Sequence, residues 1–178
     1  MVGGGWWREH RHGRLSKSLG EQSSDQPMKF LAHIPFVEHL GFELIKFEGG
    51  EAEIHYTPRP EHLNSFNVTH GGASMTLMDV VMAHAARSLA PEGGIVTVEM
   101  KTSFMQPALG ALVAKGRLIH RTATMAFTEA TIFDAQGRAC SHATGTFKYV
   151  RRLPTSTGVQ KVNCLKVKLF IKLSLERK

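Results

Sequence analysis

Cysteine is scarce in this 178-residue chain, which contains only Cys140 and Cys164. The two lie far apart in different kinds of segment, which indicates free thiols in a reducing cytoplasm rather than a disulfide framework. Zinc-type spacings of His and Cys are also missing, since no Cys or carboxylate stands at a metal-ligand spacing from His10 and His12. We therefore expect a cytoplasmic protein with neither a metal nor another cofactor.

Long hydrophobic runs are missing as well. No stretch approaches the roughly 18 consecutive apolar residues of a membrane span. The start of the chain lacks the apolar stretch of a secretory signal, because Trp6 and Trp7 are followed at once by charged residues. The chain is 42% hydrophobic and 21% charged, which is typical of a globular protein, and its length allows one ordinary domain.

The net charge of +7 is concentrated at one end of the chain. Residues 151–178 contain eight Lys and Arg against one Glu, whereas residues 28–150 carry a net charge of −1. A nucleic-acid-binding fold is expected to carry its basic residues on the folded domain, so we expect no nucleic-acid partner. The rival hypothesis, binding through the tail, predicts a salt-dependent affinity that is lost when residues 151–178 are removed.

Three segments differ in pattern. Residues 1–27 are rich in Gly, Ser and charge and have no periodicity, which predicts a disordered leader or an extension, with Met28 as a possible internal start. Residues 28–150 are predicted to be the folded domain. Residues 151–178 form a basic tail of uncertain structure, in which the alternation over residues 165–175 indicates a strand, either native or appended.

The middle segment is predicted to be an α+β fold. Residues 36–40 predict a short helix, and residues 41–56 predict two strands joined at Gly49 and Gly50. A long apolar helix is predicted over residues 72–89, where Pro91 follows its end. Four more strand-like segments cover residues 95–104, 111–120, 126–133 and 139–150. This order favours an antiparallel sheet with the helix packed on it.

Asp79 is the only carboxylate of the predicted long helix. Residues 73–86 are otherwise almost all apolar or small, so the helix is expected to be covered on nearly all sides. A buried, unpaired carboxylate costs several kcal/mol. Asp79 is therefore either a structural residue paired with an Arg or backbone groups, or a carboxylate of raised pKa suited to act as base or nucleophile.

His70, Gly71 and Gly72 stand at the start of the same helix. The first N–H groups of a helix lack intrahelical partners and lie at the positive end of its dipole. Two glycines leave those groups uncovered, so a carbonyl oxygen can accept a hydrogen bond there, as in an oxyanion hole. Glycines also permit tight turns and close packing, so the pair alone leaves both interpretations open.

Gly71 and Asp79 are too far apart to act on one substrate within one subunit. Eight helical residues span about 12 Å, whereas a reacting carbonyl lies roughly 3 Å from its donor. If both residues act, a two-fold dimer must bring Asp79 of one subunit near Gly71 of the other.

At these residues the sequence resembles the hotdog-fold acyl-CoA thioesterases, specifically the PaaI-like group of the phenylacetate-degradation type. The resemblance covers about residues 36–150. Its motif consists of an Asn six residues before H-G-G, an Asp nine after that His, a V-[ST]-V strand eighteen after the Asp, and F-x-x-P-A. The matching residues are Asn64, His70-Gly71-Gly72, Asp79, Val96-Thr97-Val98 and Phe104-Met105-Gln106-Pro107-Ala108.

The resemblance implies hydrolysis of an acyl-CoA thioester by a homodimer or a dimer of dimers, with the sheet wrapped around the long helix and coenzyme A entering as part of the substrate. The Gly71 N–H would polarise the thioester carbonyl, with Asn64 helping to place it. Asp79 of the partner subunit would activate or orient water held by Thr97, and His70 would lie near the departing thiol. Whether Asp79 acts as base or as nucleophile stays open.

The same resemblance suggests substrate contacts. Beside Gly72, the acyl chain is expected to contact Met75, Met78, Met82 and Phe104, with core packing as the alternative for each. The phosphates of coenzyme A call for a basic rim, for which the candidates are Lys148, Arg151 and Arg152. A solvated strand end is an equally good interpretation of these three.

Two rival functions remain. A hotdog enoyl-CoA hydratase pairs Asp with a His five residues on, as Asp79 and His84 are spaced, but five helical residues turn about 500° and so point the two side chains about 140° apart. The Pro and Asn usual between them in that family are absent. A non-catalytic acyl-CoA-binding protein is the other alternative, although such a protein gains little from the buried charge of Asp79.

Overall fold

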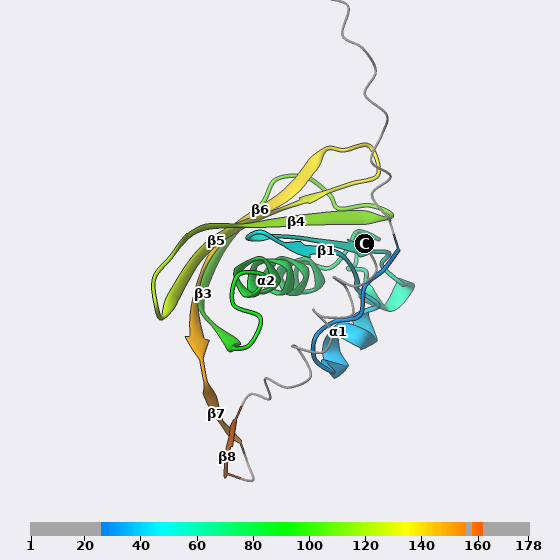
Figure 1. Ribbon diagram of the computed structural model, residues 1–178. Coiled ribbons are helices and arrows are strands. Elements are labelled where there is room, and N and C mark those ends of the chain that lie inside the picture. The colour runs from blue at the N-terminus through cyan, green and yellow to red at the C-terminus, as the bar shows by residue number, and fades with distance from the viewer. Residues whose placement is uncertain (1–25, 156–157, 162–178) are drawn as a thin grey trace, which may run out of the picture.

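The computed structural model describes residues 26–155 and 158–161 (Figure 1). The expected leader up to residue 25 and the alternating segment 165–175 lie outside the described residues. The elements in chain order are α1 (Pro35–Leu40), β1 (Glu43–Glu48), β2 (Glu51–Tyr56), a 3₁₀ turn (Pro60–His62), α2 (Gly71–Arg87), β3 (Gly94–Phe104), β4 (Leu112–Arg121), β5 (Met125–Phe133), β6 (Ala139–Val150), β7 (Arg152–Thr155) and β8 (Gly158–Lys161).

The sheet is antiparallel and wraps around α2 (Figure 1). Its strand order is β1-β2-β4-β5-β6-β3, and β7 and β8 form a separate hairpin. The predicted α+β architecture is confirmed. The ends of each strand predicted within residues 41–150 differ from those of the observed strand by at most two residues. The turn between β1 and β2 falls at Gly49 and Gly50, whose φ values of +59° and +87° suit a two-residue hairpin turn.

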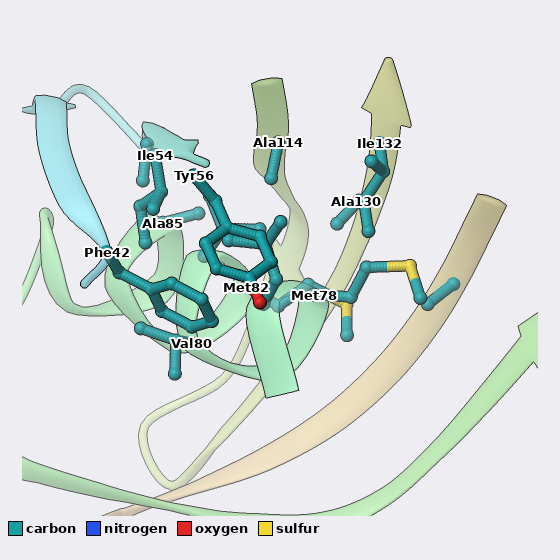
Figure 2. Close-up of a cluster of buried hydrophobic side chains, with 14 of the residues drawn as sticks. Phe42, Ile54, Tyr56, Met78, Val80, Met82, Ala85, Ala114, Ala130 and Ile132 are labelled. Carbon is teal, nitrogen blue, oxygen red and sulfur yellow. The ribbon is translucent and has the colours of Figure 1, made fainter. Parts of the chain in front are cut away.

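The hydrophobic core lies between α2 and the inner face of the sheet (Figure 2). Met78 and Met82 of the helix are completely buried there, as is Tyr56 but for 2% of its surface. The helix comes closest to the sheet at Gly116 of β4, where a Cβ would lie only 2.8 Å from the backbone oxygen of Val81. A glycine at this position therefore sets the distance between helix and sheet.

The segment that precedes β1 packs against α2 at His84. The backbone N–H of Met28 donates a 2.7 Å hydrogen bond to the carbonyl oxygen of Leu44 and so ties this segment to β1. The ring of Phe30 packs edge-on against His84 of the helix, and Phe47 does the same. His84 is buried as a result.

β3 is an edge strand of the sheet. It pairs with β6 and has no strand on its other side among the described residues. Val98 and Phe104, both on β3, are 57% and 54% exposed. The pairing with β6 shifts between Thr97 and Glu99, which marks a β-bulge next to Thr97. In the described part of the chain, no helix is long and apolar enough to cross a membrane.

Candidate active site

Asp79 meets the side chain of Thr97 across the gap between α2 and β3. The Thr97 hydroxyl donates a 2.7 Å hydrogen bond to Asp79 Oδ1. Burial raises the pKa of the Asp79 carboxyl, and the bond from Thr97 partly opposes this effect. The carboxylate is thus desolvated on one side and held in place on the other, which suits a group that exchanges a proton near neutral pH.

The structural interpretation of Asp79 required an Arg or backbone groups as its partner. Among the described residues, no arginine or lysine forms an ion pair with it. Thr76 precedes Asp79 by three residues, which is the helical spacing of a neighbour on the same face. Its hydroxyl instead donates a hydrogen bond to the carbonyl oxygen of Gly72 at 2.9 Å. The neutral hydroxyl of Thr97 is the group that holds the carboxylate.

The start of α2 has one N–H group capped and another uncapped. Nδ1 of His70 accepts a 2.9 Å hydrogen bond from the N–H of Gly72, so His70 is the N-cap of the helix. Gly71 is the first helical residue, whose N–H has no acceptor within the helix. The ring of Phe104 lies over Gly71, at 3.5 Å from the position a Cβ would take. The geometry leaves Gly71 as the candidate oxyanion donor.

Asn64 organises the loop that leads to this helix. Its side-chain oxygen accepts hydrogen bonds from the N–H groups of Phe66 and Val68, at 2.9 and 3.3 Å. Asn67, in the same loop, has φ of +57°, which Asn tolerates better than most residues. With its oxygen occupied, the Asn64 side chain has only its amide N–H groups to offer to a substrate.

Two cavities divide four of the expected catalytic residues between them, whereas His70 lines neither. One has a volume of about 560 Å³ and is lined by Asn64, Gly71 and Phe104, among others. The other, of about 410 Å³, is lined by Asp79 and Thr97. No described cavity contains both groups, which agrees with the roughly 12 Å that eight residues span along a helix. Within one chain, the Asn64 and Gly71 group thus lies apart from the Asp79 and Thr97 group.

The expected substrate contacts fall into several groups. Met78 and Met82 lie in the core and line neither cavity, so core packing, the alternative interpretation, describes them in this structure. Met75 is 40% exposed, and the N–H of Gly72 is taken by His70. The side chains of Lys148 and Arg151 are exposed at the end of β6, while Arg152 begins β7 and its side chain is not described.

Sequence reasoning missed a residue of the Asp79 cavity. Arg87 lines it together with His84, at the far end of the same helix. His84 donates Nδ1–H to the carbonyl oxygen of Val80 at 2.7 Å, and burial lowers its pKa to about 4. The spacing of residues 79, 83 and 87 on one helical face was the signal that could have revealed Arg87. No group of three or more potential metal ligands occurs among the described residues.

Comparison with known proteins shows which proteins the chain is similar to. Residues 66–141 match the family model of the thioesterase superfamily. The chain is 26% identical to "Putative esterase SSO2140" of Saccharolobus solfataricus over 131 residues, which are 73% of this chain and 87% of that protein. The match to the family model begins after Asn64 and includes His70, Asp79 and Thr97.

Solved structures agree on the fold. The conserved protein PA5202 from Pseudomonas aeruginosa aligns with a TM-score of 0.64 at 25% identity, over 67% of this chain and 97% of that one. The E. coli PaaI protein from the phenylacetic acid degradation operon aligns with a TM-score of 0.61 at 21% identity, over 65% and 83% of the two chains. The antiparallel sheet around α2 is thus the hotdog fold. Residues 66–141 thus resemble the thioesterase superfamily, and the similarity to that family and to putative esterases supports a thioester hydrolase.

Proposed function

We propose that the chain hydrolyses an acyl-CoA thioester to the free acid and coenzyme A. The observation that carries this proposal is the desolvated carboxylate of Asp79, which accepts a hydrogen bond from Thr97 of β3. Asp79 lies on α2, and the N-terminus of the same helix exposes the Gly71 N–H. A base and an oxyanion donor are the two groups that acyl transfer to water requires.

The reaction begins with a water molecule next to Asp79. The water oxygen attacks the thioester carbonyl carbon while Asp79 accepts a proton from the water. The carbonyl oxygen gains negative charge and is stabilised by the Gly71 N–H and the positive end of the α2 dipole. The carbon–sulfur bond then breaks, and the departing thiolate receives the proton, which regenerates the Asp79 carboxylate. Direct attack by Asp79, giving an anhydride that water opens, requires the same two groups.

We propose that the complete site lies between two subunits. The separation of Asn64 and Gly71 from Asp79 and Thr97 into two cavities supports this arrangement. The free edge of β3, with the exposed side chains of Val98 and Phe104, offers a surface for a second copy of the chain. Such a copy would bring its own Gly71 to the Asp79 carboxylate.

The coenzyme A half of the substrate requires cations at the mouth of the site. The side chains of Lys148 and Arg151 are exposed. They lie near the start of β3, since Lys148 pairs with Val96 in the sheet. Thr97 follows in the next register position. We therefore assign these two side chains, and Arg152 after them, to the phosphates of coenzyme A.

The first experiment is a hydrolysis panel of acyl-CoA esters with detection of the free thiol. Release of coenzyme A by the wild-type chain, with loss of release in Asp79→Asn, supports the proposal. Binding of acyl-CoA without release favours the non-catalytic alternative, and hydration of an enoyl-CoA favours the hydratase. His84 lines the same cavity as Asp79, but its Nδ1 is engaged with the carbonyl oxygen of Val80 and its ring packs against Phe30 and Phe47, which speaks against a role as a mobile proton donor in a hydratase.

A further inference from the structure

The cavity next to Asp79 contains a cation that the proposed hydrolysis does not use. Arg87 lines this cavity of about 410 Å³, and so does Asp79. The two residues are eight positions apart, so about 12 Å separates them along the helix axis, too far for a direct ion pair. The wall between them is apolar and includes Ala83 and Ile95. The cavity thus has a carboxylate at one end and a guanidinium at the other.

Nothing in the described part of the chain neutralises Arg87. Its Nε is buried and has no hydrogen-bond partner. No ion pair among the described residues includes it. Burial lowers the pKa of its guanidinium, without an opposing carboxylate. Arg87 is half-buried, and a charge that is partly removed from water is costly unless it is paired, so its position calls for an anion that comes from outside the chain.

We propose that Arg87 selects acyl groups that end in a carboxylate, so that the preferred substrates are the CoA thioesters of dicarboxylic acids. This inference rests on the proposed function, because it takes the thioester carbonyl to react beside Asp79. The acyl chain then runs along the apolar wall, and its terminal carboxylate reaches the guanidinium, which is suited to a bidentate pair.

The phosphates of coenzyme A are the other anions in the substrate. They are separated from the thioester by the long pantetheine arm, whereas Arg87 shares one cavity with Asp79. The acyl side of the thioester is therefore the side on which Arg87 finds its partner. An experiment that varies the acyl end alone distinguishes the two anions.

Adipyl-CoA and hexanoyl-CoA form the matched pair of substrates, because both have six acyl carbons and differ in the terminal carboxylate. We expect the wild-type chain to show a kcat/KM for adipyl-CoA at least about tenfold above that for hexanoyl-CoA. In Arg87→Met the ratio of the two values should fall by about ten- to a hundredfold, as for loss of a charge-assisted pair. Arg87→Lys should retain part of the preference. Arg117→Met, on the outer face of the sheet, is the control in which the ratio stays unchanged.

A ratio cancels differences in the active fraction of each preparation, so partial unfolding of a variant cannot imitate the effect. A wild-type ratio near one, or a ratio that Arg87→Met leaves unchanged, overturns the inference. An equal loss for both substrates does so too, because it assigns Arg87 to the coenzyme A phosphates. If neither ester is hydrolysed, the proposed function fails, and calorimetric binding of the same two esters decides the inference. Tighter binding of adipyl-CoA that depends on Arg87 supports it, and equal binding overturns it.

Discussion

The Thr97 hydroxyl on β3 donates a hydrogen bond to Asp79 Oδ1 on α2 at 2.7 Å, and this bond joins the edge strand to the central helix. The bond favours the ionised carboxylate and thus opposes the increase in pKa that burial causes. In Thr97→Val the pKa of Asp79 should increase further. Because hydrolysis requires ionised Asp79, the acidic limb of the pH profile of kcat/KM should move to higher pH, and activity should fall by about tenfold or more. Thr97→Ser is the control that retains the hydroxyl, and an unmoved acidic limb in Thr97→Val would show that the bond does not tune Asp79.

Asp79→Asn is expected to reduce acyl-CoA hydrolysis by about a thousandfold or more while the chain stays folded. Full turnover by the Asn variant on the best substrate would contradict the catalytic assignment.

The same Asp79→Asn variant should be at least as stable as the wild type at neutral pH, because it removes a desolvated charge. A carboxyl whose folded pKa is raised contributes stability below its unfolded pKa, and this contribution is lost as the pH increases through the folded pKa. Denaturant unfolding at several pH values measures that difference.

Mixed dimers test the sharing of the site. Asp79→Ala and Gly71→Pro each remove one half-site, so each pure variant should be inactive. When the two variants exchange subunits, one of the two sites in each heterodimer regains both an intact Asp79 and an intact Gly71. Mixing should therefore restore up to roughly a quarter of the wild-type activity, because half of the dimers are mixed and each has one site of two. No recovery despite demonstrated exchange would place the complete site within one subunit.

His70→Ala should act mainly on stability. The variant removes the acceptor of the Gly72 N–H and so removes the N-cap of α2. Loss of a cap typically costs about 1 kcal/mol in the free energy of unfolding. His70→Asn, which supplies another capping oxygen, should recover most of that loss. If His70→Ala leaves stability unchanged and abolishes hydrolysis, His70 has a role at the thiol rather than in the cap.

Gly116→Ala should destabilise the chain by about 1–3 kcal/mol, as overpacking does in a filled core. The added methyl group would lie 2.8 Å from the backbone oxygen of Val81, which cannot move without the helix. Gly93→Ala is a suitable control, because its Cβ would find its nearest neighbour at 3.8 Å. Equal free energies of unfolding for the two variants would show that the helix adjusts freely to the sheet.

The sequence was sufficient for the fold, and the division of the site between two subunits stays a prediction. The helical rise alone separated Gly71 from Asp79, and strand periodicity located the strands of the sheet. The hydrogen-bond partner of Asp79 was harder to find, because the contact of Thr97 with α2 depends on the register of β3 with β6. The family motif named Thr97, whereas the spacing within the helix pointed to Thr76. The helical spacing placed Arg87 on the face of Asp79, but the lack of a partner for its Nε and its position in the cavity could be seen only in the packed structure.

Thr97 lies beside the bulge that shifts β3 against β6 between Thr97 and Glu99. Because alternate residues of a strand face opposite sides, a one-residue slip would turn Thr97 away from α2 and present Val98 instead. The chain would then lose the hydroxyl at Asp79 without any change in its amino-acid composition. An insertion or deletion of a single residue between Pro91 and Thr97 is therefore equivalent, for the chemistry of Asp79, to a substitution in the site itself.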